Sequence, residues 1–261
     1  MKIGFIGFGN MAQALAEGFL LKQAAAPEDI YACARNWEKL EANAKKYGIC
    51  PCRDAAETAE RSDLVVVAVK PYQVEEVLTP VKEILKDKIV VSVAAGMPFE
   101  TYERFLAPGT RHISTVPNTP VSIGEGIVVC EDIHSLTDED YRQFRELFSQ
   151  VGVVVSVGTK LLGIAGTVCG CGPAFAAMFI EALADAAVLH GIPRDLAYQM
   201  ASQVVAGTGK LQEASGTHPA AMKDAVCSPG GTTIVGVAAL ERKGFRSAVI
   251  DAVDAVEHKK K

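Results

Sequence analysis

The sequence lacks an excess of positive charge. It has 26 lysines and arginines against 31 aspartates and glutamates, which gives a net charge of −5 at pH 7. The only basic run is Lys259-Lys260-Lys261, and we expect a solvated tail there because chain termini are usually loose. A nucleic-acid-binding domain needs a concentrated basic surface, so the composition argues against that class of protein.

Long apolar runs are also missing. No segment approaches the roughly 18 uninterrupted apolar residues expected of a membrane helix. The apolar N-terminus is interrupted by glycines, Asn10 and Gln13, and no small-residue cleavage site follows it, so no signal peptide is predicted. With 49% hydrophobic and 22% charged residues, the composition is typical of a soluble globular enzyme, and we predict a cytoplasmic protein.

The cysteines lack the pattern of a disulfide framework, because there are seven of them in a long chain. Two C-x-C pairs occur, Cys50-Pro51-Cys52 and Cys169-Gly170-Cys171. Neither has C-x-x-C spacing, and no histidine is close in sequence, so we predict no metal site. Buried thiols in a reducing cytoplasm are the simpler interpretation.

The chain up to residue 158 alternates between short apolar runs and helical patterns. DLVVVAV (63–69) is the clearest strand, because a continuous β-branched run is expected where helices cover both faces of a sheet. The alternation predicts an α/β fold with a parallel, doubly wound sheet, a Rossmann-type domain over 1–158. The expected strands are 2–7, 30–34, 63–69, 88–94, 111–116, 126–131 and 151–157, and the expected helices include 10–22, 37–47 and 74–85.

Beyond Gly158 the pattern changes to alanine-rich segments of helical period, with no further convincing strand. The predicted helical segments are 174–191, 195–214 and 233–260. Large apolar side chains occur on several faces of these helices at once, which favours burial against a second copy. We predict an all-α domain over 159–261 that forms a homodimer, with higher oligomers built from dimers left open.

The stretch Gly7-Phe8-Gly9-Asn10-Met11-Ala12 has the G-x-G-x-x-A spacing of a dinucleotide-binding turn between a strand and a helix. Gly7 permits the tight turn, Gly9 lets the backbone approach a pyrophosphate, and Ala12 allows close packing of helix on strand. The pyrophosphate would lie at the positive end of helix 10–22. The alternative is a glycine turn without a ligand. The residues assigned to the cofactor here are Ile6, Gly7, Phe8, Gly9, Asn10 and Met11.

The end of the second strand, Ala32-Cys33-Ala34-Arg35-Asn36, has no carboxylate. A site for NAD usually has one there to accept hydrogen bonds from the ribose 2′-OH. Arg35 instead offers a cationic fork for a 2′-phosphate, and Asn36 offers an amide. We predict a preference for NADP(H) over NAD(H), unless Arg35 is only a surface charge.

Two more segments leave strands at the same edge of the predicted sheet. Ala68-Val69-Lys70-Pro71 is assigned to the cofactor, with Lys70 either contacting ribose or solvated. Asn118 lies in the proline-stiffened segment 116–120, VPNTP. We assign it to both cofactor and substrate because an amide can donate and accept, although a plain turn between strands is equally consistent.

The segment 224–234, DAVCSPGGTTI, predicts a turn followed by a helix. Gly230 and Gly231 expose backbone N–H groups, and Thr232 and Thr233 add hydroxyls in the first helical turn. Free amides, hydroxyls and the helix dipole together favour a small anion such as a carboxylate. The alternative is a capped helix start in which threonine serves its own backbone.

Five segments occur together in one order: GFIGFGNMA, AVKP, VPNTP, CGPAFAAMFIEAL and DAVCSPGGTTIVGVAALE. This combination closely resembles the pyrroline-5-carboxylate reductase family over essentially the whole chain, and SPGGTT is its specific part. The resemblance implies a Rossmann domain followed by a helical domain that interlocks with its twin. It also implies reduction of 1-pyrroline-5-carboxylate to proline by NADPH, the last step of proline biosynthesis.

In that family the substrate site lies at the dimer interface, with SPGGTT facing the nicotinamide. The resemblance therefore gives Thr233 a hydrogen bond to the substrate ring nitrogen. The resemblance also implies that the backbone of Gly230, Gly231 and Thr232 binds the substrate carboxylate. Ser228 belongs to the same site. One departure concerns Ala55, which stands where many members have an asparagine near the adenosine. The ribose and 2′-phosphate contacts are therefore less well defined by the resemblance.

The implied chemistry needs no strong acid from the protein. A protonated cyclic imine is already electrophilic, so a neutral donor such as Thr233 suffices to orient the nitrogen or relay a proton. The histidines are accordingly scattered: His112, His134, His190, His218 and His258.

Two alternatives to this function remain. A hydroxyacid dehydrogenase of the 6-phosphogluconate type would need a catalytic lysine in the central helices, and 170–187 contains none. A dinucleotide-binding regulator without turnover is the other alternative, and the intact SPGGTT turn argues against it.

Overall fold

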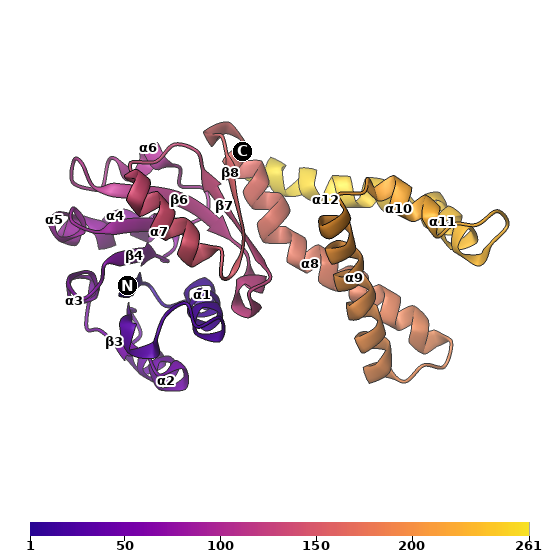
Figure 1. The fold of residues 1–261 in the computed structure, drawn as a ribbon, viewed down its shortest axis with the longest axis horizontal. Coiled ribbons are helices and arrows are strands. Elements are labelled where there is room, and N and C mark those ends of the chain that lie inside the picture. The colour runs from indigo at the N-terminus through magenta and orange to yellow at the C-terminus, as the bar shows by residue number, and fades with distance from the viewer. Residues whose placement is uncertain (261) are drawn as a thin grey trace. The chain divides into compact units, whose positions relative to one another are not determined.

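An eight-stranded sheet with the strand order β3-β2-β1-β4-β5-β6-β7-β8 forms the centre of the N-terminal part of the chain (Figure 1). The computed structural model describes residues 1–260 and divides into two compact units, Met1–Gly170 and Cys171–Lys261. The strands are β1 (Ile3–Ile6), β2 (Ile30–Cys33), β3 (Cys50–Pro51), β4 (Leu64–Val67), β5 (Ile89–Ser92), β6 (Arg111–Pro117), β7 (Gly126–Glu131) and β8 (Gly152–Val157).

The sheet is mostly parallel rather than fully parallel as predicted. Strands β1 to β6 pair in parallel, β6 pairs with β7 antiparallel, and β7 pairs with β8 in parallel. The reversal follows from the connection between β6 and β7, which consists only of residues 118–125 with the 3₁₀ helix η4 (Thr119–Ile123). A parallel crossover needs about a dozen residues or more, so this segment can only turn the chain back.

Helices cover both faces of the sheet, and side chains alternate between two cores. Ile3 and Phe5 point into the core beneath α1 (Asn10–Leu21), α2 (Trp37–Tyr47) and α7 (Asp138–Phe148). Ile6 points to the opposite face, covered by α3 (Ala55–Glu60), α4 (Val74–Leu78), α5 (Lys82–Leu85) and α6 (Phe99–Tyr102). The doubly wound arrangement predicted from the sequence is therefore confirmed.

The predicted continuous helix 74–85 is wrong. It divides into α4, the 3₁₀ helix η3 (Thr79–Val81) and α5, because Pro80 has no N–H to donate in a helix interior. The short strand β3 and the helices α3, α6 and α7 were not among the predicted elements.

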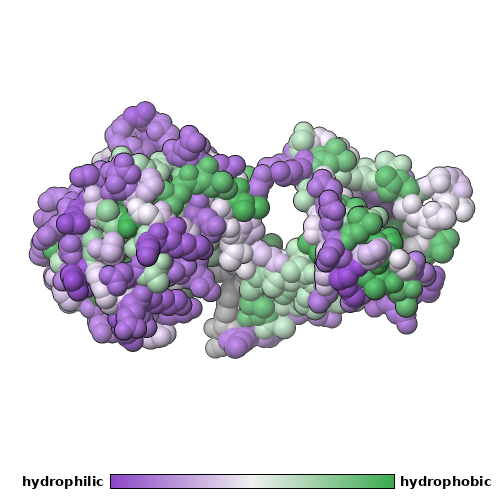
Figure 2. All heavy atoms as spheres, turned by 90° about the horizontal axis from the view of Figure 1, so that it is seen from below, coloured by the Kyte–Doolittle hydropathy of each residue, from purple (hydrophilic) through white to green (hydrophobic). Residues whose placement is uncertain are grey.

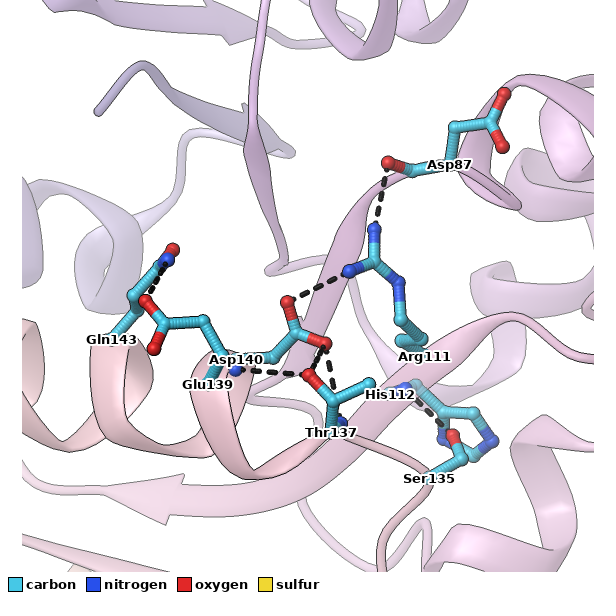
Figure 3. A network of polar contacts seen from close by, with 8 residues as sticks. All are labelled: Asp87, Arg111, His112, Ser135, Thr137, Glu139, Asp140 and Gln143. Atoms are coloured by element: carbon cyan, nitrogen blue, oxygen red, sulfur yellow. Dashed lines mark hydrogen bonds and ion pairs between the residues drawn. The ribbon is translucent and has the colours of Figure 1, made fainter.

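A polar network attaches α7 to the start of β6 (Figure 3). Arg111 donates from Nη1 to Asp140 Oδ1 at 2.7 Å and from Nη2 to the carbonyl oxygen of Asp87 at 2.9 Å. Asp140 and Thr137 form a capping box at the start of α7. Burial alone would raise the pKa of Asp140, but the hydrogen bonds from Thr137 and Arg111 lower it overall. The network keeps this helix against the sheet.

The second unit is helical. Its helices are the C-terminal part of α8 (Thr159–Leu189), then α9 (Arg194–Ser215), α10 (Pro219–Ala225), α11 (Thr232–Arg242) and α12 (Phe245–Lys260). The predicted helix 233–260 is divided into α11 and α12 at Gly244, where φ is +74°. Helix α8 begins at Thr159, and the division between the compact units falls inside it. The predicted domain boundary at 158/159 stays a prediction.

The helices of the second unit bury little within one chain. Among its described residues, the buried apolar core consists of Ala184, Ala197 and Ala201. Figure 2 shows apolar side chains gathered on the surface of these helices. Large exposed members include Met178, Leu189, Val204, Leu211, Val235 and Ile250. An exposed apolar surface of this kind is typical of an interaction site.

Helix α8 bears on the prediction that the chain has no membrane segment. By length and composition alone α8 could cross a membrane, and little of it is buried within the chain. Glycines, Thr167 and Pro173 interrupt the apolar residues of α8, but the helix as a whole remains strongly apolar. A single helix of this kind is weak support for a membrane span, because a helix that packs in an assembly has the same composition.

Candidate cofactor and substrate sites

The glycine turn is attached to three parallel strands. The N–H of Gly7 donates to the carbonyl of Cys33 at the end of β2 at 3.0 Å, and the N–H of Ala68 after β4 donates to that of Ile6 at 2.8 Å. Gly7 has φ +93°, and a Cβ there would lie 2.7 Å from a methyl group of Val69 and 2.8 Å from the oxygen of Ala68. Only glycine can occupy this position without a shift of the backbone.

Gly9 keeps open space in front of α1. A Cβ built on it meets no atom within 4 Å, and no side chain caps the helix that follows it. The first amides of α1 and the positive end of its dipole are therefore available to an anion, and the first turn contains no acidic residue to compete. This geometry fits the pyrophosphate of a dinucleotide.

A pocket of about 460 Å³ lies at the carboxyl ends of β1, β2 and β4. Of the predicted cofactor residues, Ile6, Gly7, Arg35 and Val69 line it together. The pocket is completed by Cys33, Ala34, Arg53, Asp54, Ala55, Ala56, Gln73, Glu76, Val77, Pro80 and Val81. Arg53 is the main addition, because no sequence pattern places a second arginine beside Arg35.

Some predicted cofactor residues have protein contacts instead. The ring of Phe8 is buried and packs edge-on against Phe5, with 5.8 Å between centroids, so only its backbone can face a ligand. Asn36 caps α2 by accepting from Lys39 N–H through Oδ1 at 2.9 Å, which leaves its Nδ2 for a phosphate. Gly9, Asn10, Met11, Ala68, Lys70 and Pro71 do not line the pocket, and their contacts to the cofactor stay predictions.

Asn118 is buried and uses both ends of its amide within the protein. Its Oδ1 accepts from Ile127 N–H at 2.9 Å, and its Nδ2 donates to the carbonyl of Cys169 in α8 at 3.2 Å. That carbonyl lacks its helical donor because the residue four positions later is Pro173. Asn118 therefore satisfies a carbonyl orphaned by the proline, and any ligand contact must use its second N–H or remaining lone pairs.

The SPGGTT segment forms the predicted turn, but the prediction that Gly231 exposes its backbone N–H is wrong, because that N–H is hydrogen-bonded within the turn. Gly230 has φ +68°, and Gly231 N–H donates to the carbonyl of Ser228 at 3.0 Å. Gly231 is the N-cap of α11 and supplies no side-chain cap, so the amides of the first turn remain free. Within residues 1–260, the exposed hydroxyls of Thr232 and Thr233 make no hydrogen bond. The alternative, in which these hydroxyls cap their own helix, is not the observed arrangement.

Cys33 and Cys52 are buried thiols. All seven cysteines are free, and burial raises the pKa of the Cys33 and Cys52 thiols, which makes them poor nucleophiles at neutral pH. Over the described part of the chain, no group of three or more potential metal ligands occurs.

The sheet order, the glycine turn and the arginine-lined pocket define a dinucleotide-dependent oxidoreductase of the Rossmann class. Residues 2–96 match the family model described as NADP oxidoreductase, coenzyme F420-dependent, and residues 159–261 match the model for pyrroline-5-carboxylate reductase dimerisation. The chain is 44% identical over 259 residues to the pyrroline-5-carboxylate reductase of Treponema pallidum, covering 98% of each chain. The corresponding Escherichia coli enzyme is 40% identical over 253 residues, covering 97% of this chain and 94% of the other. The chain belongs to the pyrroline-5-carboxylate reductase family.

Solved structures agree with this assignment. The pyrroline carboxylate reductase of Plasmodium falciparum, solved with NADP bound, has a TM-score of 0.88 at 29% identity and covers 99% of this chain and 96% of that chain. The reductase of Coxiella burnetii has a TM-score of 0.86 at 28% identity, with coverages of 99% and 96%. The predictions of the family, the fold class, an oxidoreductase and an NADP-binding domain are confirmed, and the C-terminal domain is a dimerisation domain.

Proposed function

We propose that the protein reduces 1-pyrroline-5-carboxylate to L-proline with NADPH. Family membership supports this reaction, because the two relatives that are 44% and 40% identical over nearly the whole chain are named pyrroline-5-carboxylate reductases. The observation that carries the proposal is the start of α11, where free amides lie beside the unpaired hydroxyls of Thr232 and Thr233. A small carboxylate next to a ring nitrogen matches that combination of donors.

The division of labour among the residues follows from their chemistry. Bound NADPH supplies the hydride. The glycine turn and the first turn of α1 hold the pyrophosphate, and Arg35 contacts the 2′-phosphate. The backbone of Gly230 to Thr232, with Ser228, holds the substrate carboxylate. The hydroxyl of Thr233 donates to the ring nitrogen or relays a proton to it, and positioning of the two reactants provides the remaining rate enhancement.

The substrate site is completed by dimerisation in this proposal. The SPGGTT turn is exposed on a helical unit whose apolar surface needs a partner, and its residues would meet the nicotinamide end of a Rossmann domain in the dimer. We further propose that residues 1–158 and 159–261 are the cofactor and dimerisation domains. Assemblies larger than the dimer would be built from dimers, and the enzyme would act in the cytoplasm.

The test is oxidation of NADPH in the presence of pyrroline-5-carboxylate, with proline measured as the product. Turnover that depends on both reactants supports the proposal. Tight NADPH binding without turnover would instead favour the dinucleotide-binding regulator.

Arg35 provides a test of cofactor choice. A charge-assisted bidentate contact contributes about 1.5–3 kcal/mol, so Arg35→Ala is expected to raise the KM for NADPH by roughly tenfold or more. The KM for NADH should change little, since NADH has no 2′-phosphate. Steady-state kinetics with both cofactors measures the difference, and equal effects on the two would show that Arg35 does not read the phosphate.

A further inference from the structure

A second arginine lies in the same pocket as Arg35. Arg53 follows β3 directly and precedes α3, whereas Arg35 follows β2. Strands β2 and β3 are neighbours in the sheet, with Tyr31 paired to Cys50 and Ala32 to Pro51. The two arginines therefore lie at the same edge of the sheet, because each follows one of two adjacent parallel strands. Both line the 460 Å³ pocket.

The guanidinium of Arg53 is positioned by an aromatic ring. Its Cζ lies 4.3 Å from the centroid of Trp37, the first residue of α2 and the second residue after Arg35. Arginine stacks favourably on an indole face while its N–H groups, which point outward in the plane of the guanidinium, remain free to donate. Its backbone is also fixed, because Arg53 N–H donates to Glu57 Oε2 at 2.7 Å.

Neither guanidinium is neutralised by the protein. Across the part of the chain that the structure describes, Arg35 and Arg53 take part in no salt bridge, in contrast to Arg61, which pairs with Glu57 at 3.6 Å. Two carboxylates line the same pocket. Asp54 is engaged through Oδ1 as the N-cap of α3, and Glu76 comes from α4, after β4 on the other side of β1.

We propose that Arg53, stacked on Trp37, is a second contact for the adenosine 2′-phosphate and shares that group with Arg35. This deepens the proposed function, because it rests on NADPH as the cofactor. Two unpaired cations at one sheet edge match the charge of a phosphate monoester, which is close to −2 at neutral pH. This pair of arginines, Arg35 and Arg53, forms a clamp on the phosphate. The clamp also supplies polar contacts at the pocket wall, where the side chain of Ala55 offers none.

The test measures equilibrium binding of NADPH and NADH by calorimetry, without substrate. Arg53→Gln is expected to weaken NADPH binding about tenfold and NADH binding less than twofold, because only NADPH has the 2′-phosphate. Arg53→Lys keeps the charge but loses the planar fork, so an intermediate loss is expected. Trp37→Leu should weaken NADPH binding several-fold, because the guanidinium loses its platform.

Arg61→Gln is the matched control. Arg61 also lies over an aromatic ring, with Cζ 5.6 Å from the centroid of Tyr31, but it does not line the pocket and is already ion-paired. It should leave both affinities unchanged. The proposal is overturned if Arg53→Gln weakens NADPH and NADH binding equally, or weakens neither.

The outcome is independent of the test of the proposed function. A wild-type protein that distinguishes NADPH from NADH through Arg53 but does not turn over pyrroline-5-carboxylate would refute the reductase function and leave the clamp intact. Turnover with an unchanged cofactor preference in Arg53→Gln would refute only the clamp.

Discussion

Replacing Met178 by aspartate is expected to convert the protein to monomers of 27.7 kDa and to reduce kcat/KM about a hundredfold or more. Met178 is 68% exposed in the single chain and lines an apolar groove of about 490 Å³ with Phe179, Leu183, Phe245 and Val249. Burying a methionine side chain contributes about 1.5–3 kcal/mol, and a two-fold interface contains each substitution twice.

The introduced carboxylate adds a larger penalty. An unpaired charge in an apolar interface costs several kcal/mol, and two copies of the substitution remove an amount comparable to the roughly 8 kcal/mol that a micromolar Kd represents. Light scattering gives the mass, and the same samples are assayed for activity. Ile133→Asp is the control, because Ile133 is a comparably exposed apolar residue outside the dimerisation domain. A fully active 27.7 kDa species at low concentration would contradict the dimer-interface site.

Thr233→Val is expected to lower kcat/KM with pyrroline-5-carboxylate by roughly ten- to a few-hundred-fold, the range of one hydrogen bond in a closed site at about 1.4–3 kcal/mol. Valine keeps the branched shape and removes only the hydroxyl. The amides at the start of α11 stay in place because Gly231, not Thr233, is the N-cap. Binding of NADPH should hardly change, since the cofactor is held by the glycine turn and Arg35.

A second valine variant separates this effect from a general loss of a hydroxyl. Thr79 donates to the carbonyl of Glu75 in the preceding helix α4 at 2.7 Å, and Thr79→Val should retain wild-type kinetics. If Thr233→Val also retains full efficiency, its hydroxyl has no role in catalysis. Proton delivery would then come from solvent or from an imine that is already protonated.

The parts of the site that depend on local sequence could be predicted. The glycine turn, the lack of a carboxylate after β2 and the turn at Gly230 and Gly231 before α11 are properties of short segments with known backbone demands. The structure adds that Gly7 is required by contact with Val69 and Ala68. The buried parallel strands could also be predicted from the sequence, because such a strand has a continuous apolar run.

Features that depend on partners distant in sequence could not be predicted. Arg53 reaches the pocket only because β3, two residues long and containing Pro51, pairs with β2, and so short a strand has no periodic signal. The role of Asn118 depends on the carbonyl freed by Pro173 in α8. The antiparallel direction of β7 depends on the length of the connection between β6 and β7. The apolar pattern of the strands alone does not include that length.

We expect the SPGGTT turn and the NADP-binding domain to act together on a cyclic imine carboxylate. The most direct measurement mixes the purified protein with NADPH and 1-pyrroline-5-carboxylate and follows both the absorbance of NADPH and the formation of proline. We expect one proline to form for each NADPH consumed, with NADPH preferred to NADH. Tight binding of NADPH with no consumption in the presence of the imine would contradict it.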